Sequence, residues 1–197
     1  MTTTLATPIL TATSEQADEA VAVIALACAT DPLVRWAYPD PAEYLRHWPT
    51  VVRAFGGNAF SHGTAHHTEG FTGAALWLPP GVHPDEGTLV ATLESTVAPD
   101  RLQATFDMFD QMAWHHPEGP HWYLPLIGVD PGYQGMGHGA ALLQHALERV
   151  DRDRLPAYLE STNARNLSLY RRHGFEVVGT IQVSDAPTLY PMIRPAR

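Results

Sequence analysis

The stretch VDPGYQGMGHGAALL, residues 129–143, carries the strongest chemical signal in the chain. Four glycines fall between residues 129 and 139, directly before an apolar pattern with helical spacing. Glycines let a backbone approach a ligand closely, and the start of a helix presents unpaired N–H groups at the positive end of its dipole. The combination predicts a site for a pyrophosphate that is held by backbone amides.

Two nucleotide-binding motifs compete for this stretch. A P-loop needs a lysine after its last glycine, and the chain contains no lysine, so this motif is excluded. Gly135, Gly137 and Ala140 match the dinucleotide pattern G-x-G-x-x-A, and Glu160 follows at a strand end where a ribose-binding acid is expected. However, five residues separate the preceding strand from the first of these glycines, and 37 residues after Glu160 are too few for a doubly wound sheet. The pattern that remains is Q-x-x-G-x-G, at positions 134, 137 and 139.

The elements that position this stretch are strands and helices in mixed order. Apolar and turn patterns predict strands at 8–12, 64–68, 72–78, 122–129, 157–162, 175–183 and 188–194. They predict helices at 15–29, 42–55, 88–114 in two pieces, from the glycine stretch to about 150, and 164–174, with a loop at 33–41. We therefore expect one α/β domain over residues 1–197, built on a mixed sheet of six or seven strands.

Composition narrows the function further. The net charge of −9 disfavours a nucleic-acid partner, because an acidic surface repels phosphate backbones. Cys28 is the only cysteine, and it lies in an apolar run too short to span a bilayer. The N-terminal residues show no signal peptide, and the histidines show no zinc spacing. We expect a cytoplasmic protein with no metal and no membrane partner.

Two motifs together resemble a known family. The segment V-D-P-x-x-Q-G-x-G-x-G-x-x-L-L after an apolar strand resembles motif A of the GCN5-related N-acetyltransferases, the GNAT family. LESTNARNLSLYRRHGF, residues 159–175, resembles motif B of the same family, and the order of elements is similar to that of the family. The resemblance implies a mostly antiparallel sheet with helices on both faces and with splayed fourth and fifth strands.

The resemblance also implies acetyl-CoA as the cofactor. The pantetheine arm would bond backbone groups of the fourth strand in the splay, and the pyrophosphate would lie on the glycine stretch. Asn163 and Asn166 stand at motif B positions that reach the pantetheine or the adjacent backbone. The implied cofactor-binding residues are Ile127, Gly128, Val129, Gln134, Gly135, Met136, Gly137, His138, Gly139, Ala140, Asn163 and Asn166.

Acetyl transfer needs a group that takes a proton from the amine and a group that gives one to the leaving thiolate. Tyr170 stands at the usual acid position of the family, and the alternative is a packed aromatic side chain. Glu160 is the candidate base because it lies on the fifth strand beside the splay, with a histidine or water as alternatives. We expect direct transfer without an acetyl-enzyme, because Cys28 belongs to an early helix.

Aromatic residues near the predicted acceptor side favour a small, partly apolar or aromatic amine. The candidate substrate-binding residues are Trp36, Tyr38, His121 and Trp122. The sequence thus predicts an acetyl-CoA-dependent N-acetyltransferase, as a monomer or a homodimer. A peptide or protein N-terminal acetyltransferase and a non-catalytic acyl-CoA-binding module remain as alternatives.

Overall fold

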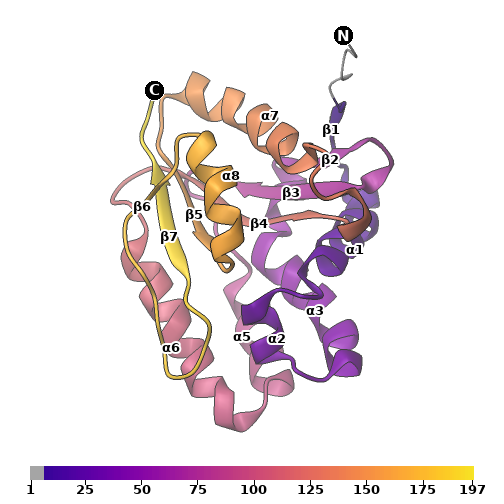
Figure 1. Cartoon of the computed structure of the whole chain (residues 1–197), viewed down its shortest axis with the longest axis vertical. Coiled ribbons are helices and arrows are strands. Elements are labelled where there is room, and N and C mark those ends of the chain that lie inside the picture. The colour runs from indigo at the N-terminus through magenta and orange to yellow at the C-terminus, as the bar shows by residue number, and fades with distance from the viewer. Residues whose placement is uncertain (1–6) are drawn as a thin grey trace.

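A seven-stranded sheet forms the centre of the computed structural model, which describes residues 7–197 (Figure 1). The strands are β1 Ile9–Thr11, β2 Ala65–Thr68, β3 Gly73–Leu78, β4 Trp122–Val129, β5 Ala157–Ser161, β6 Glu176–Val177 and β7 Tyr190–Arg194. They lie in the order β1-β2-β3-β4-β5-β7-β6, and every neighbouring pair is antiparallel except β4 and β5. The predicted mixed, mostly antiparallel sheet is therefore confirmed. Residues 1–6 lie outside the described residues. The predictions of a domain that starts at residue 1 and of no signal peptide both involve these residues.

The helices are α1 Ala17–Cys28, α2 Pro32–Ala37, α3 Pro41–Gly56, α4 Asn58–Ser61, α5 Glu86–Thr96, α6 Pro99–His115, α7 His138–Asp153 and α8 Leu167–Arg172. Aspartates cap several of them, because a carboxylate accepts from the first free N–H groups of a helix. Asp40 caps α3 and Asp85 caps α5 in this way. Within residues 7–197, each helix is too short or too polar to cross a membrane.

The prediction of a loop at 33–41 is wrong for its first part, because residues 32–37 form helix α2. The Asp31 carboxylate accepts hydrogen bonds from the N–H groups of Leu33 and Val34, at 3.0 and 3.2 Å. Pro32 occupies the first position of the helix, where the missing N–H costs nothing and the fixed φ is favourable. The Asp-Pro pair therefore ends one helix and starts the next.

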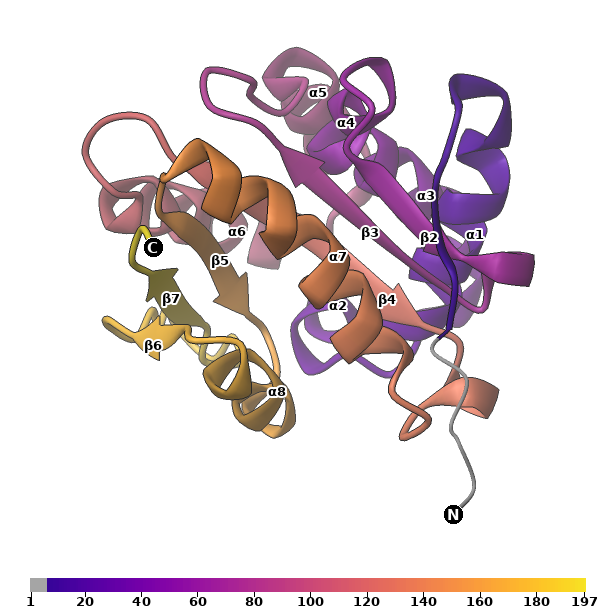
Figure 2. The ribbon, with the colours of Figure 1, turned by 90° about the horizontal axis from the view of Figure 1, so that it is seen from above.

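Helices cover both faces of the sheet, as Figure 2 shows, with α7 across one face and α1 and α3 on the other. Val21 and Ile24 of α1 and Val52 of α3 belong to one buried cluster against β3 and β4. Leu142 and Leu143 of α7 belong to a second cluster on the opposite face. Tyr170 and Phe175, from α8 and the residues after it, join this second cluster. The helices thus fix both faces of the sheet around β4 and β5.

Strands β4 and β5 pair only near their first residues, Trp122 with Ala157 and Tyr123 with Tyr158. On its other side β4 contains a β-bulge, because Tyr123 pairs with Leu78 while Leu126 pairs with Leu76. Pro125 lies in the bulge, where a residue without an N–H group is tolerated and where strand twist increases. The strands diverge beyond this point, which leaves backbone groups on their facing edges without a ladder partner. The splay that the resemblance implies is thus present.

The prediction of a long strand at 175–183 is also wrong, because the strand found there is only two residues long. Only Glu176 and Val177 pair with β7, and Ile181 makes a single bridge to Leu189. The rest of the segment packs its apolar side chains against α6, with Ile181, Val183, Ala186 and Leu189 buried beside Met108 and Met112. The apolar pattern that suggests a strand therefore reflects contact with a helix.

Candidate active site

One cavity of about 740 Å³ lies where β4 and β5 diverge. At one end it is lined by the glycine stretch and the start of α7, and in the middle by β4 from Leu124 to Val129 and by Leu159 and Glu160 of β5. At the other end its walls come from α2, α3 and α6. The cavity therefore joins the predicted cofactor site to the predicted acceptor side.

The glycine stretch forms a tight turn that leads into α7. Asp130 accepts from the N–H group of Gly132 at 2.8 Å, and the Gln134 amide donates to the Val129 carbonyl oxygen at 3.1 Å. Gly135 and Gly137 have φ values of 78° and 92°, in the left-handed region that favours glycine. A Cβ atom at either position would meet no heavy atom within 4 Å, so the backbone here faces open space.

Helix α7 begins directly after this turn, with Gly137 as its N-cap. The N–H groups of the first helical turn have no carbonyl partner within a helix, and they carry the positive end of the helix dipole. His138, Gly139 and Ala140 of this turn line the cavity. This cradle fits the pyrophosphate of acetyl-CoA, since amides and open space are what such a group requires.

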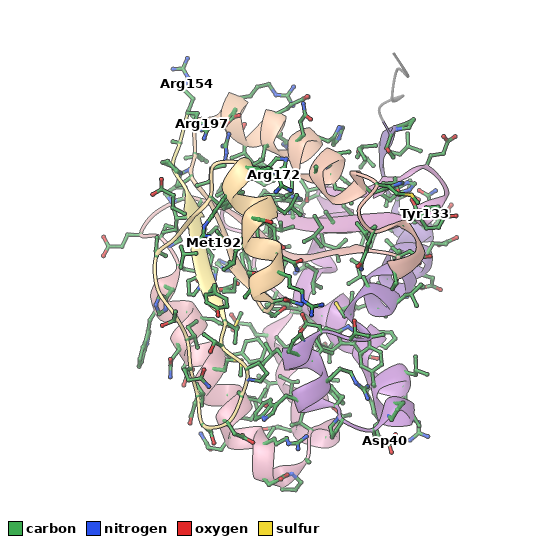
Figure 3. The ribbon with its side chains drawn as sticks, in the orientation of Figure 1. Asp40, Tyr133, Arg154, Arg172, Met192 and Arg197 are labelled. Atoms are coloured by element: carbon green, nitrogen blue, oxygen red, sulfur yellow. The ribbon has the colours of Figure 1, made fainter. Side chains whose placement is uncertain are left out.

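Two arginines that the sequence reasoning missed also line the cavity. Arg165 follows β5 in a short 3₁₀ turn, Ala164–Asn166, and Arg172 belongs to α8. Figure 3 labels Arg172 on α8 and Tyr133 at the turn before α7. The signal in the sequence is that both arginines follow Asn163 within the segment that resembles motif B. They provide positive charge for an anionic ligand in an otherwise acidic protein.

The predicted walls of the pantetheine site lie on opposite sides of the cavity. Ile127, Gly128 and Val129 line it from β4, and Asn163 and Asn166 line it from the segment after β5. The Asn163 side chain accepts from the N–H group of Arg165 at 3.0 Å, so its oxygen stabilises the local turn. A Cβ atom on Gly128 would lie 2.7 Å from the Ala27 Cβ, which explains why glycine is needed where α1 crosses β4.

Tyr170 lines the cavity between α8 and the end of α1, where Cys28 and Asp31 are its neighbours. The phenol ring is buried and contacts Phe175 edge to face. Burial, followed by the nearby Asp31 carboxylate and Cys28 thiol, raises the pKa of Tyr170 well above its ordinary value. The hydroxyl therefore remains protonated at neutral pH and is able to donate.

Cys28 and Asp31 are cavity residues that the sequence reasoning did not assign to the site. Burial, with a smaller contribution from Asp31, raises the pKa of the Cys28 thiol to about 12. Asp31 accepts from the Thr162 hydroxyl at 2.6 Å, and burial raises the pKa of its carboxyl. The carboxylate thus ties the start of α2 to the segment after β5.

Glu160 lines the cavity from β5, and its side chain is only 3% exposed. Its Oε2 accepts a hydrogen bond from the Tyr123 hydroxyl at 2.9 Å. Its Oε1 is buried and has no hydrogen-bond partner among residues 7–197. A buried carboxylate oxygen without a partner is costly, so this oxygen is available to accept a hydrogen bond.

The end of the cavity at the predicted acceptor side is aromatic and apolar. Its walls include Trp36, Tyr38, Phe55, Met108 and Phe109. The Trp36 indole donates to Asp185 at 3.1 Å, which fixes the ring against the segment after β6. The buried Tyr38 hydroxyl shares a 2.7 Å hydrogen bond with Thr96. Trp36 and Tyr38 therefore line the cavity, and their contact with a substrate stays a prediction.

Three other candidate residues lie outside the cavity lining. Met136 is 63% exposed on the turn. Trp122 is buried against α7, where its indole donates to Asp153 at 3.0 Å, because strand alternation turns it to the face opposite Tyr123. His121 contacts His116 and Tyr158 at the start of the strands. We therefore withdraw Trp122 and His121 as substrate contacts. No group of three or more metal-binding side chains occurs within residues 7–197.

The splayed sheet and the glycine cradle are the features that the resemblance to the GNAT family implies. The profile of the Acetyltransferase (GNAT) family matches residues 36–175. The match covers more than half of the chain, and the chain belongs to this family.

Individual relatives agree with this assignment. A mycothiol acetyltransferase from Beutenbergia cavernae is 36% identical over 112 residues, which are 55% of this chain and 30% of that protein. The peptidyl-lysine N-acetyltransferase YjaB of Escherichia coli is 28% identical over 71 residues, 36% of this chain and 47% of that protein. The chain spans 30–38% of the length of the first mycothiol acetyltransferases that it matches.

A solved structure supports the fold over the whole chain. The structure named as histone acetyltransferase HPA2 and related acetyltransferase from Corynebacterium glutamicum has a TM-score of 0.69 at 26% identity, and the match covers 98% of both chains. Arylalkylamine N-acetyltransferase 2 from Aedes aegypti has a TM-score of 0.67 at 13% identity, covering 96% of this chain and 99% of that one. The second likeness concerns the fold alone.

Proposed function

We propose that this protein is an N-acetyltransferase that moves the acetyl group of acetyl-CoA directly to the primary amine of a small, partly apolar molecule. One observation carries the proposal. A single cavity runs from the glycine cradle through the splay to the aromatic pocket, so donor and acceptor can meet there. A shared cavity removes the need for an acetyl group carried by the protein.

The donor half is formed mostly by backbone. Acetyl-CoA supplies an acetyl thioester that an amine can attack. The amides at the start of α7 and the side chains of Arg165 and Arg172 hold its phosphates, and the free edge of β4 at Ile127, Gly128 and Val129 orients the pantetheine arm. Glycine at 135 and 137 keeps the approach to these amides open.

The catalytic roles fall on two side chains that face the same cavity. An alkyl amine is mostly protonated at neutral pH, so it must lose a proton before it attacks. Glu160, which lines the cavity, takes this proton on its carboxylate. Tyr170, which burial keeps protonated, donates to the departing sulfur. The Cys28 thiol, with a pKa of about 12, stays protonated and does not act as a nucleophile.

The acceptor half supports a small substrate. Aromatic and methionine side chains form most of its walls, and the segment around Asp185 is tied to Trp36 at this end. Such a pocket suits an apolar body that carries a single amine. The mycothiol acetyltransferases among the relatives support a small-molecule acceptor, whereas the name of the Corynebacterium structure supports a protein acceptor.

The test measures acetyl-CoA turnover by free-thiol release and by the mass of the product, against a panel of amines. The panel contains arylalkylamines, aminonucleosides, polyamines, amino acids and short peptides. We expect turnover to be fastest with amines that carry an aromatic or apolar body. Turnover with peptides alone would replace the small-amine proposal, and binding of acetyl-CoA without any turnover would favour a non-catalytic module.

A further inference from the structure

A cluster of titratable side chains lies beside Glu160, at the closed end of the splay, and none of its histidines lines the main cavity. His116 and His121 come from the segment between α6 and β4, and Tyr123 and Tyr158 come from the two paired ends of β4 and β5. The His116 ring lies 4.7 Å from the Tyr123 ring and 4.3 Å from the Tyr158 ring. Glu160, His116 and His121 follow one another from the cavity toward the surface.

Hydrogen bonds fix the neutral tautomers of both histidines. His121 Nδ1 lies 2.9 Å from the Gly119 carbonyl oxygen, which can only accept, so this nitrogen carries the proton. Its Nε2 is therefore an acceptor, and it lies 3.0 Å from His116 Nδ1. His116 Nδ1 must then carry a proton and donate it, which leaves the Nε2 lone pair of His116 free.

That free lone pair faces Glu160. His116 Nε2 lies 3.6 Å from Glu160 Oε1, the buried oxygen that has no hydrogen-bond partner within residues 7–197. The second oxygen of Glu160 is already held by the Tyr123 hydroxyl. Donor and acceptor groups in an unliganded site are often this far apart and close when substrate binds. Glu160 thus lies between the cavity on one side and an available base on the other.

From this arrangement, which rests on the proposed acetyl transfer, we propose that His116 is a positioning residue that relays the amine proton from Glu160 to solvent through His121. The proton bound at Glu160 Oε1 moves to His116 Nε2, and His116 releases its Nδ1 proton to His121 Nε2. His121 releases its Nδ1 proton to water. Glu160 is again a carboxylate, and exchange of both half-buried rings with water restores the starting tautomers.

The charges around the relay suit this direction. Burial, and then the Glu160 carboxylate, raise the pKa of Tyr123 and of Tyr158, so both phenols stay neutral and do not compete for the proton. Burial lowers the pKa of His121, and His116 and His83 add to this effect, while the hydrogen bond to the Gly119 carbonyl and the Glu160 carboxylate oppose it. The titratable groups that face His116 are His121, Glu160 and the two tyrosines.

The experiment compares His116→Ala with His115→Ala as the matched control. His115 is the neighbouring histidine, and its Nδ1 is engaged with the Gln111 carbonyl oxygen at 2.8 Å, outside the relay. We expect His116→Ala to lower kcat by about 10- to 100-fold, at the low end of what proton transfer contributes, with little change in KM for either substrate. Added imidazole should restore much of the lost kcat in His116→Ala and should not affect His115→Ala.

The outcomes separate the relay from the proposed function. Wild-type kcat in His116→Ala, or a loss that imidazole does not rescue and that raises both KM values, would overturn the relay while leaving acetyl transfer intact. Absence of turnover in the wild type with every amine would overturn the proposed function instead. A second measurement does not depend on turnover or on a variant. Nitrogen chemical shifts of the histidine rings should show His116 and His121 as Nδ1–H tautomers when neutral, and an Nε2–H tautomer at His116 would contradict the relay.

Discussion

The two glycines at the start of α7 give a sharp test of the acetyl-CoA site, because alanine at each has opposite effects on stability. Gly137 has a φ of 92°, and an L residue in this region costs roughly 1–2 kcal/mol. For a chain of this size, each kcal/mol corresponds to about 2–4 °C in Tm. Gly139 is helical, and alanine in a helix is favoured over glycine by roughly 0.5–1 kcal/mol. We expect Gly137→Ala to lower Tm and Gly139→Ala to keep or raise it.

Both substitutions should nevertheless weaken acetyl-CoA binding. A Cβ atom on Gly139 would lie 3.4 Å from the Leu169 Cδ2 and 3.8 Å from the Val129 Cγ2, two residues of the cavity wall. The methyl group therefore fits the protein but occupies space beside the ligand. We expect at least a tenfold loss of affinity, equivalent to about 1.4 kcal/mol. Calorimetry with acetyl-CoA and thermal unfolding of the free protein measure the two effects separately.

Gly132→Ala is the matched control for this test. It lies in the same turn, outside the cavity lining, and its Cβ would only approach the Asp130 carboxylate at 3.4 Å. Its affinity for acetyl-CoA should equal that of the wild type. A Gly139→Ala protein that is stable and binds acetyl-CoA with unchanged affinity would refute the placement of the pyrophosphate at the start of α7.

Three further predictions concern single side chains of the cavity. Tyr170→Phe should lower kcat by roughly 10- to 1,000-fold with little change in KM, and an unchanged kcat when chemistry limits the rate would remove Tyr170 from the mechanism. Cys28→Ala should keep its turnover, because a thiol with a pKa of about 12 is not a nucleophile at neutral pH, and loss of transfer with both substrates still bound would argue for an acetyl-enzyme. Burial raises the pKa of the Asp31 carboxyl above its ordinary 3.8, so the folded protein binds this proton more tightly than the unfolded chain does. The stability of the protein therefore falls as pH rises from the pKa of the unfolded chain to the higher pKa of the folded protein. Asp31→Asn should remove this part of the dependence of Tm on pH, and identical profiles for variant and wild type would contradict it.

The residues of the predicted donor half lie in short contiguous motifs, so the sequence alone places them near one another. The glycine stretch and the helix after it follow from local spacing, whereas Asn163 and the splay of β4 and β5 follow from the resemblance to the GNAT family. Arg165 and Arg172 are part of the same segment, but their approach to the cavity depends on the angle at which α8 packs, which no local pattern gives.

The residues of the predicted acceptor side come from distant segments, so their positions depend on tertiary packing. Trp36 reaches the cavity on a helix that the sequence analysis treats as a loop. Trp122 is turned into the core by strand alternation, while its neighbour Tyr123 supports Glu160. Met108 and Met112 of α6 line the cavity and pack against the segment after β6, which leaves the sheet there. These contacts are tertiary, and hydrophobic periodicity does not encode them.

We propose that the space between β4 and β5 holds acetyl-CoA within reach of Tyr170 and Glu160. A crystal structure of the protein with CoA tests this claim most directly. We expect the pyrophosphate against the amides of residues 137–140, the pantetheine arm along the free edge of β4, and the thiol near the Tyr170 hydroxyl. CoA bound elsewhere, or bound with its thiol directed away from Tyr170 and Glu160, would refute this placement.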